Sequence, residues 1–361
     1  MRDLDIVRRK ADHLRIVAEG EVEHREGTLL DEIHLVHQAL PEIDLDDIDT
    51  TTEFFGKTLK HPFMITSMTG GADYAENLNR AIAEAGARLG IAVALGSQRV
   101  MLEHPELSSD FQVRNYIPDG VLLGNIGAVQ LKEYSPDQIA EVTKQIEADG
   151  MCVHLNPAQE IVHGEKGQQD YSGLLDAIAR LIDRMNGQVL VKETGAGISP
   201  ETIVKLKSIG VPYIDVSGSG GTSWTRVEAY RTTDKLHEKL GMTFADWGIP
   251  TAFCTLAARS ICKESVCIIS SGGLRNGLDA ARSIAAGANV AGFARPVLLA
   301  FLEKGAERIT SWFEEVIAEY RSAMFLSGAR NNEELHRVPR MYTGKLLEWL
   351  NSYEIYDRVK V

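Results

Sequence analysis

The densest group of chemically capable residues in the chain is the segment from His154 to Glu160, which reads HLNPAQE. It continues an apolar run typical of a buried strand, and His154 and Asn156 fall on the same side of that strand by alternation. One carboxylate beside amides suits a Mg²⁺ ion that takes its other ligands from water and a substrate's phosphates, which makes Glu160 a candidate metal ligand. A zinc site would need several His or Cys at close spacing. The structural alternative for Glu160 is a helix-cap contact.

Lys192 ends another apolar run, directly before Glu193. An ammonium group at the end of a strand can form a Schiff base, or it can stabilise negative charge that develops on a bound ring. The structural alternative is a lysine held in a salt bridge. The polar turns bring together no Ser/His/Asp or Cys/His set, so hydrolysis by a protein nucleophile is not expected.

Two glycine-bearing turns indicate an anion site. Residues 271–275 read SGGLR and residues 292–296 read GFARP. Backbone N–H groups in such turns, followed by a helix N-terminus, can hold a phosphate. A tight turn alone would explain either segment, but two of them in consecutive units favour phosphate binding. The glycines at 218–221 lack the G-x-G-x-x-G spacing of a dinucleotide-binding fold.

Polar groups also follow other apolar runs. Residues 97–99 read SQR, and the guanidinium of Arg99 is suited to bind phosphate with two hydrogen bonds. Residues 66–71 read TSMTGG and supply hydroxyls and backbone amides that a flat conjugated ring would need along its polar edge. The basic residues 8–10, with His13, are either a solvated surface or functional groups, and the second case requires that they fold over the site.

These groups share one position in a repeated unit. Eight short apolar runs are each followed by a Gly-rich or polar turn, and they are apolar at successive positions, as strands buried on both faces should be. The predicted strands cover residues 63–67, 92–95, 121–125, 151–155, 189–192, 213–217, 266–270 and 290–293. The pattern predicts an α/β fold, a (β/α)8 TIM barrel, in which the C-terminal strand ends form the single face that carries chemistry.

Helical patterns fill the intervals between the strands. Residues 75–89 have apolar residues at helical spacing, and Ser or Asn before Pro or Gly marks three further helix starts. These residues are Ser135, Ser199 and Asn276. Residues 221–250 form a long polar stretch, and loops above about 12–15 residues are usually functional lids or disordered.

We expect one domain over residues 1–361 with an N-terminal extension (1–60), the barrel (61–302) and a C-terminal helical tail (303–361). In the extension, residues 32–40 could form a strand or a short helix, and residues 41–49 are expected to be a loop. In the tail, helices are expected at 306–321 and 342–352.

The composition narrows the possible partners. The formal net charge of −13, from 38 Lys and Arg against 51 Asp and Glu, argues against a nucleic-acid partner. The four cysteines form no C-x-x-C pair, which predicts buried free thiols in a reducing compartment. The N-terminus lacks the apolar core of a signal peptide, and no apolar stretch approaches the ~20 residues of a membrane span. We therefore expect a cytoplasmic protein with no membrane partner.

The motifs together resemble a known family. MTGG, GSQR, GNIGA, HLNPAQE, VKETGAGIS, DVSGSGGTSW, SGGLRNG and GFARP occur in order, after an N-terminal R-K-x-x-H. This set, from Arg9 to about Pro296, is similar to the type II isopentenyl diphosphate isomerases, which are FMN-dependent β/α barrels. HLNPAQE and SGSGGTSW are the motifs most specific to that family.

The resemblance implies an activity and its cofactors. The family interconverts isopentenyl and dimethylallyl diphosphate by a 1,3-proton shift with no net redox change. It uses reduced FMN, which NADPH or another reductant must supply, and Mg²⁺. Family members form tetramers or larger assemblies, so a homo-oligomer (tetramer or octamer) is expected.

The resemblance also implies the roles of individual residues. FMN would contact Thr66, Ser67, Met68, Ser97, Asn125, Lys192, Ser217 and Thr222, and its phosphate would lie on Gly272, Gly273, Arg275, Ala294 and Arg295. The substrate would contact Arg9, Lys10, His13, Ser97, Gln98, Arg99, His154, Asn156 and Gln159, with Glu160 on Mg²⁺. The implied catalytic residues are Gln159, Lys192 and His154.

A 1,3-proton shift on an unactivated alkene needs an acid at one carbon and a base at another. We hypothesise that the reduced flavin itself transfers the proton, that Lys192 beside the ring favours its anionic form, and that Gln159 positions the substrate. The alternative function is an FMN oxidoreductase of the hydroxy-acid oxidase or dihydroorotate dehydrogenase kind. A flavin-storage or regulatory protein without turnover is a third class, and it would not require a metal ligand such as Glu160.

Overall fold

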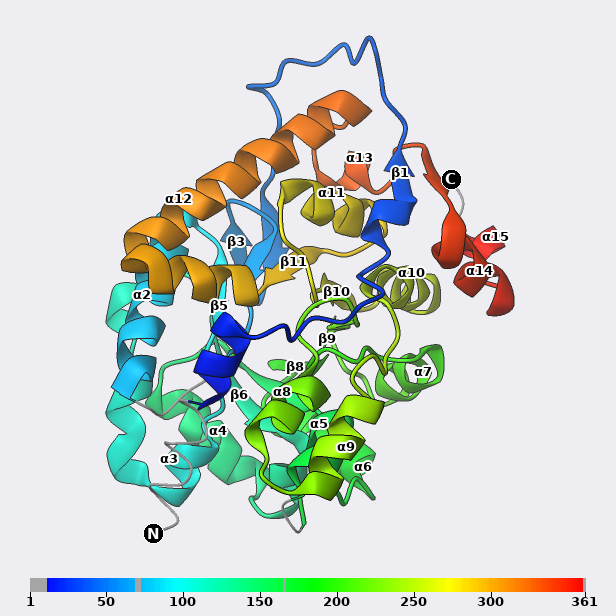
Figure 1. Cartoon of the computed structure of the whole chain (residues 1–361). Helices are drawn as coiled ribbons and strands as arrows, with labels where there is room; N and C mark the ends of the chain where they lie inside the picture. The colour runs from blue at the N-terminus through cyan, green and yellow to red at the C-terminus, as the bar shows by residue number, and fades with distance from the viewer. Residues whose placement is uncertain (1–11, 69–72, 165–166, 360–361) are drawn as a thin grey trace.

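The fold is seen in a computed structural model of the chain, which describes residues 12–68, 73–164 and 167–359. Within these ranges, eight parallel strands close into a barrel in the order β10-β11-β4-β5-β6-β7-β8-β9 (Figure 1). The strands are β4 (Phe63–Ile65), β5 (Ala92–Ala94), β6 (Leu122–Gly127), β7 (Gly150–Leu155), β8 (Val189–Glu193), β9 (Tyr213–Asp215), β10 (Cys267–Ser270) and β11 (Val290–Phe293). The predicted (β/α)8 TIM barrel of the α/β class is confirmed, and each predicted strand overlaps an observed one.

The strand register aligns the polar strand ends. His154 on β7 lies opposite Lys192 on β8, and Lys192 lies opposite Asp215 on β9. Apart from the partly buried Tyr213 at the start of β9, the strand residues before these positions are buried, so these polar side chains lie together at the C-terminal rim.

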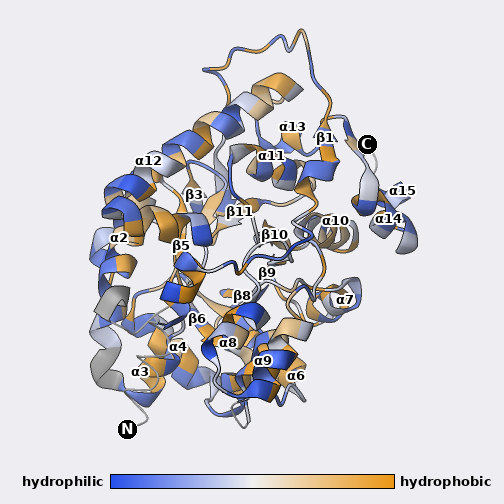
Figure 2. Ribbon diagram, in the orientation of Figure 1, coloured by the Kyte–Doolittle hydropathy of each residue, from blue (hydrophilic) through white to orange (hydrophobic). Residues whose placement is uncertain are grey.

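Helices surround the barrel and have both hydrophobic and hydrophilic residues along their length (Figure 2). They are α2 (Asp73–Leu89), α3 (Arg99–Glu103), α4 (Pro136–Gln145), α5 (Pro157–His163), α6 (Leu174–Arg184), α7 (Pro200–Ser208), α10 (Thr251–Cys262) and α11 (Gly277–Ala285), with 3-10 turns at Leu30–Glu32, Pro105–Phe111, Arg114–Tyr116 and Ala128–Lys132. The three predicted helix starts are confirmed, because Ser135, Ser199 and Asn276 each accept a hydrogen bond from the backbone N–H three residues later.

The polar stretch after β9 is not the long loop that the sequence analysis expected. It forms α8 (Trp224–Arg231) and α9 (Lys235–Thr243). Ser223 caps α8 by accepting from Arg226 N at 3.3 Å, and Asp234 caps α9 by accepting from Leu236 N at 2.8 Å. The prediction failed because α8 buries polar residues such as Arg226 and Glu228, so it lacks the apolar stripe that identifies a surface helix.

A hairpin in the N-terminal extension closes the end of the barrel away from the polar rim. It consists of β2 (Thr52–Phe54) and β3 (Lys57–Leu59). Phe54 is buried, and Phe55 stacks on Tyr213 at the start of β9 with a centroid distance of 4.0 Å. Because the hairpin covers the N-terminal strand ends, the polar rim at the C-terminal ends is the end available for a site.

The C-terminal tail contains a β-strand as well as helices. It contains α12 (Arg295–Ser327), which is interrupted at Lys304 and Gly305, then α13 (Asn332–Leu335), α14 (Gly344–Ser352) and α15 (Tyr356–Val359). Strand β12 (Arg340–Tyr342) pairs antiparallel with β1 (Ile33–Leu35), so residues 33–35 of the ambiguous segment 32–40 are a strand and residues 36–40 are neither strand nor helix. The expected helix at 342–352 therefore begins two residues later, after a strand whose partner is distant in the sequence. In Figure 1 the red tail lies beside the blue N-terminal segment.

The four cysteines are free, as predicted; Cys152, Cys254 and Cys262 are buried and Cys267 is partly buried. Within the described ranges, no helix combines the length and apolar character that a membrane span needs.

Candidate active site

A cavity of about 460 Å³ opens at the C-terminal ends of the barrel strands. Its volume lies in the range of about 300–1,000 Å³ typical of small-molecule sites. The cavity brings together most of the predicted site residues, which are His13, Thr66, Ser67, Met68, Ser97, Arg99, Asn125, His154, Asn156, Gln159, Glu160, Lys192, Ser217, Thr222, Gly272, Gly273, Arg275, Ala294 and Arg295. They come from the ends of all eight strands and from the N-terminal extension.

Among the described substrate contacts that the sequence analysis predicted, Gln98 does not line the cavity. Arg9 and Lys10 lie outside the described residues. Gln98 is fully buried; its Nε2 donates to Gly96 O at 2.6 Å, and its Oε1 accepts from Asn125 N. The Gln98 amide thus joins the loop after β5 to strand β6 and does not line the cavity, a role that sequence proximity to Arg99 does not reveal.

One end of the cavity is suited to an anion. Gly272 and Gly273 have φ angles of 96° and 89°, and a Cβ on Gly272 would lie 2.2 Å from Gly218 O, so this close turn requires glycine. The adjacent helix α12 begins with no side-chain cap from Ala294, and Ala294, Arg295 and Pro296 at its N-terminus line the cavity. These features fit the phosphate of FMN.

Lys192 lies between this end and the segment 154–160. Its side chain is buried, and Nζ donates to Glu193 O at 2.5 Å. It forms no ion pair with any described residue, so the salt-bridge alternative does not describe it. The hydroxyl of Ser67, also in the wall, is buried and has no hydrogen-bond partner among the described residues. A buried ammonium and a free hydroxyl suit the polar edge of a flavin ring.

His154 is a neutral imidazole in this setting. Burial, assisted by the nearby Lys192 charge, lowers the pKa of His154 to about 3. Its Nδ1 lies 3.1 Å from Asn125 Oδ1, and because a carboxamide oxygen only accepts, Nδ1 is the donor. At neutral pH His154 can orient a ligand by hydrogen bonding, but it brings no positive charge to a diphosphate.

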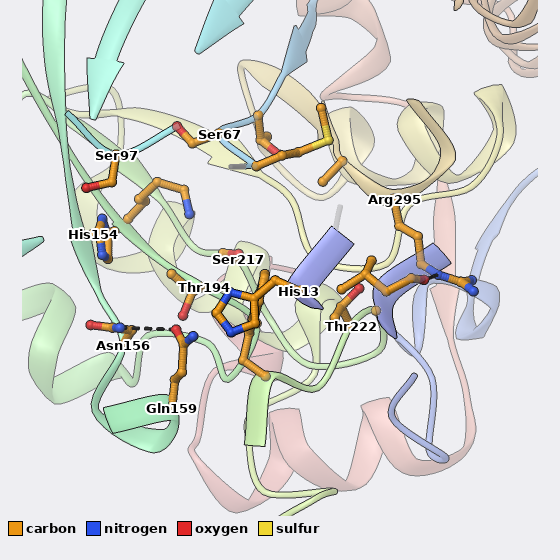
Figure 3. Close-up of a pocket in the computed structure, with 18 of the residues that line it drawn as sticks. His13, Ser67, Ser97, His154, Asn156, Gln159, Thr194, Ser217, Thr222 and Arg295 are labelled. Atoms are coloured by element: carbon orange, nitrogen blue, oxygen red, sulfur yellow. Dashed lines mark hydrogen bonds between the residues drawn. The ribbon is translucent and has the colours of Figure 1, made fainter. Parts of the chain in front are cut away.

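The orientation of Asn156 and Gln159 is fixed by a chain of hydrogen bonds. Tyr171 Oη donates to Asn156 Oδ1 at 3.1 Å, so Asn156 Nδ2 is the donor to Gln159 Oε1 at 3.1 Å and to Glu160 Oε1 at 2.7 Å. Figure 3 shows the contact between Asn156 and Gln159 on the side of the cavity opposite Arg295. Gln159 Nε2 then donates to Glu228 Oε1 at 2.8 Å, so both ends of its amide are held.

Glu228 on α8 is a residue that the sequence analysis missed. It is 1% exposed and contacts His13 Nε2 at 2.9 Å and Arg231 Nε at 2.7 Å, besides Gln159. Burial alone would raise the pKa of Glu228, but the contacts with His13, Arg231 and Gln159 outweigh burial and hold it below its usual range. The carboxylate therefore stays ionised. His13 reaches it from a helix at residues 12–19, so at least this part of the N-terminal basic segment covers the site.

Glu193 is a second residue without a role in the sequence analysis. Its Oε2 accepts from the backbone N–H groups of Thr194, Gly195, Ala196 and Gly197 at 2.6, 2.7, 2.5 and 3.2 Å. Burial raises the pKa of Glu193 to about 7, although these donors favour the ionised form. The side chain holds the turn after β8, from which Thr194 and Gly195 line the cavity.

Glu160 is the predicted metal ligand. Its Oε1 accepts from Asn156 and its Oε2 lies 3.4 Å from His163 Nδ1. These are side-chain contacts, so Glu160 does not cap helix α5. The described residues contain no cluster of three or more His, Cys, Asp or Glu that could hold a metal ion. A cation at Glu160 would accordingly take further ligands from water and a bound diphosphate, which is a common arrangement for Mg²⁺.

The chain matches the family described as FMN-dependent dehydrogenase over residues 6–104 and 129–339. It is 41% identical to an isopentenyl-diphosphate delta-isomerase of Pyrococcus furiosus, over 96% of this chain and 89% of the relative. It is 42% identical to one of Metallosphaera sedula, over 99% of both chains.

Solved structures of flavoenzymes share the fold. A mandelate oxidase with (S)-2-phenylpropionate has a TM-score of 0.66 at 16% identity, covering 94% of this chain and 98% of the other. A flavocytochrome b2 variant with pyruvate bound has a TM-score of 0.66 at 16% identity, covering 90% and 80%. At this identity the likeness extends to the barrel fold alone.

Proposed function

Because the chain belongs to the FMN-dependent dehydrogenase family and, within it, to the isopentenyl-diphosphate delta-isomerases, we propose that it interconverts isopentenyl and dimethylallyl diphosphate by a 1,3-proton shift. One structural observation supports this proposal in addition to the names of the relatives. One cavity has a glycine turn at Gly272 and Gly273 at one end and the polar side chains of Arg99 and Glu160 at the other, with the Lys192 ammonium in its wall. Such a cavity suits a flavin phosphate and a substrate diphosphate together.

FMN would lie with its phosphate at the N-terminus of α12 and its ring edge at Ser67 and Lys192. Bound there in its reduced form, it would supply an electron-rich ring that exchanges a proton, with NADPH or another reductant as the electron source. The buried Lys192 ammonium would stabilise negative charge on a ring bound beside it. Thr66, Met68, Ser97, Asn125, Ser217 and Thr222 would complete the contacts to the cofactor.

The residues at the other end would bind and orient the substrate. Arg99 and His13 would bind the diphosphate, and Glu160 would hold Mg²⁺, which offsets the charge of the phosphates. Gln159 would position the alkene, since a carboxamide is too weak an acid to protonate it alone. The Glu228 carboxylate fixes the Gln159 amide and thus the direction in which its atoms face the cavity.

Other parts of the proposal depend on the family resemblance and the composition. We place the single-domain protein (1–361) in the cytoplasm and expect it to form a homo-oligomer, with no nucleic-acid or membrane partner.

The decisive experiment is an anaerobic assay of isopentenyl diphosphate with the purified protein, FMN and Mg²⁺. We expect dimethylallyl diphosphate to form when FMN is reduced by dithionite or NADPH, with the flavin still reduced at the end. Oxidised FMN should support no turnover. Net oxidation of a substrate coupled to flavin reduction, without isomerisation, would instead identify the alternative oxidoreductase and refute the proposal.

A further inference from the structure

Three charged side chains from distant parts of the chain meet in the cavity wall. Glu23 belongs to the N-terminal extension, Arg275 follows β10, and Arg295 begins α12. Arg275 Nη2 lies 2.8 Å from Glu23 Oε2, and Arg295 Nη1 lies 3.1 Å from Glu23 Oε1. One carboxylate thus bridges two guanidinium groups, with one oxygen on each, in the way that two oxygens of a phosphate would.

The bridge is located at the anion-binding end of the cavity. Arg275 follows the turn at Gly272 and Gly273, and Arg295 is the first residue of α12, whose N-terminus has no side-chain cap. Figure 3 shows Arg295 beside Thr222 and away from His154 and Asn156. The Glu23 carboxylate therefore lies among the groups that would bind the flavin phosphate.

The backbone of Glu23 is fixed, whereas its side chain is not enclosed. Glu23 forms a β-bridge with Thr222, and its carbonyl oxygen accepts from Arg226 Nη1 at 2.8 Å. The next residue, His24, donates its backbone N–H to Gly221 O at 2.9 Å. The Glu23 side chain is 37% exposed, so it can turn away from the arginines while the backbone stays in place.

We propose that Glu23 is a counter-ion built into the flavin phosphate subsite, which the phosphate ester of the flavin must displace from Arg275 and Arg295. The inference rests on the proposed function for the identity of the ligand. A phosphate monoester has a charge of about −1.5 to −2 at pH 7, greater than that of one carboxylate, so it can compete for the two guanidiniums. A flavin without phosphate cannot.

The Glu23 carboxylate consequently acts as a selectivity element. It neutralises part of the positive charge at the subsite and penalises anions, because two negative groups on the same pair of arginines repel each other. Only a ligand with a doubly charged phosphate and the additional contacts of its ring overcomes this penalty. The alternative is a structural role, in which Glu23 only orients the two arginines and so strengthens phosphate binding.

A pair of substitutions separates these roles. The full-length wild-type protein, Glu23→Gln and Glu26→Gln are freed of flavin and titrated with FMN and with riboflavin, and flavin fluorescence reports binding. Glu26 is the matched control because it lies on the same segment and pairs with Lys345 at 3.0 Å, outside the cavity lining. Thermal unfolding of each variant checks that it is folded.

We expect Glu23→Gln to bind FMN about tenfold more tightly than wild type, because one repulsive charge close to the phosphate is removed. Riboflavin affinity should be unchanged, and Glu26→Gln should match wild type for both ligands. FMN affinity that is unchanged or weaker in Glu23→Gln, or an equal gain for riboflavin, would overturn the inference. If wild type binds FMN and isomerises the substrate while Glu23→Gln shows no gain, only this inference fails. If wild type binds no flavin, the proposed function fails with it.

Discussion

Glu160 and Glu228 are two carboxylates at the same end of the cavity with different environments. Glu160 shares one oxygen with the Asn156 amide, whereas Glu228 is enclosed by Gln159, His13 and Arg231. The first is arranged to accept a cation together with a ligand, and the second to hold other side chains. Substituting Glu160 should therefore change the dependence of activity on Mg²⁺, whereas substituting Glu228 should change kcat.

For Glu160→Gln we expect Mg²⁺-dependent isomerisation to fall by about 100-fold or more, because the neutral amide is a poor ligand for a hard cation. FMN binding should be retained, since Glu160 lies away from the phosphate end. Activity and FMN affinity measured over a Mg²⁺ titration provide the test. Turnover equal to wild type at every Mg²⁺ concentration would remove the metal assignment.

For Glu228→Gln we expect kcat to fall by about 10²-fold, because Gln159 and His13 lose the charge that fixes them and small displacements of positioning groups are costly. FMN affinity should stay within twofold of wild type. The half-exposed Glu238, paired with Lys235 at 2.8 Å on α9, provides a control, and Glu238→Gln should retain full activity. An unchanged kcat in Glu228→Gln would show that the Gln159 contact has no part in turnover.

Residue chemistry and the family resemblance together named many of the polar residues that line the cavity, because the C-terminal strand ends of a barrel converge on one face. They could not identify Glu228 or Glu23. Each belongs to the site because it contacts a residue that is distant in the sequence; Arg275 Nη2, for example, lies 2.8 Å from Glu23 Oε2. The local spacing of residues in the sequence does not predict such contacts. Gln98 illustrates the opposite error, since a residue between two cavity residues has its side chain buried beneath them.

At the scale of elements, the eight strands and the capped helices were predictable because periodicity and capping are local. Helices α8 and α9 were not, although Ser223 and Asp234 stand at their starts. Helix α8 can lie in the interior because its buried polar side chains have partners. Arg226 Nη2, for example, lies 3.0 Å from Asp246 Oδ1. Tertiary contacts of this kind override the apolar pattern on which helix prediction depends.

The cap of α9 can be tested directly. Asp234 accepts hydrogen bonds from Leu236 N and His237 N at 2.8 and 3.0 Å. Asp234→Ala should lower the free energy of unfolding measurably, whereas Asp234→Asn, which can also cap, should lose only a fraction of this. Urea unfolding monitored by circular dichroism measures both. Equal stability of the alanine and asparagine variants would show that the side chain does not cap the helix.

At the scale of the molecule, the two ends of the chain are joined outside the barrel. The β1–β12 pairing and the hydrogen bond from Leu346 N to Glu32 Oε2 at 2.5 Å tie the C-terminal tail to the N-terminal extension. The same extension continues to Glu23 and His13 in the cavity wall. The sequence suggested an extension and a tail, but which strand pairs with which is a long-range property that neither segment shows alone.

Buried histidines make the whole fold sensitive to acid. Burial, with the charges of Arg321 and Lys60, lowers the pKa of His61 to about 4, below the ordinary value near 6.5 that we expect in the unfolded chain. Between these values the unfolded state binds more protons, so the His61 contribution is fully present above about pH 6.5 and is lost as pH falls towards 4.

We therefore expect the unfolding free energy of wild type to fall more steeply between pH 6.5 and 4.5 than that of His61→Gln. The difference should reach roughly 1 kcal/mol, a value discounted for the partial exposure of the ring. His37, which is exposed, serves as the control, and His37→Gln should follow the wild-type curve. Parallel curves for wild type and His61→Gln would contradict the assignment.

The most direct test of the account is a crystal structure of the protein with reduced FMN, Mg²⁺ and isopentenyl diphosphate, prepared without oxygen. The account predicts the flavin phosphate against Gly272, Gly273 and the N-terminus of α12, the ring beside Lys192, and the diphosphate at Arg99 with Mg²⁺ on Glu160. A flavin bound outside the strand-end cavity, or a diphosphate far from Arg99 and Glu160, would contradict it.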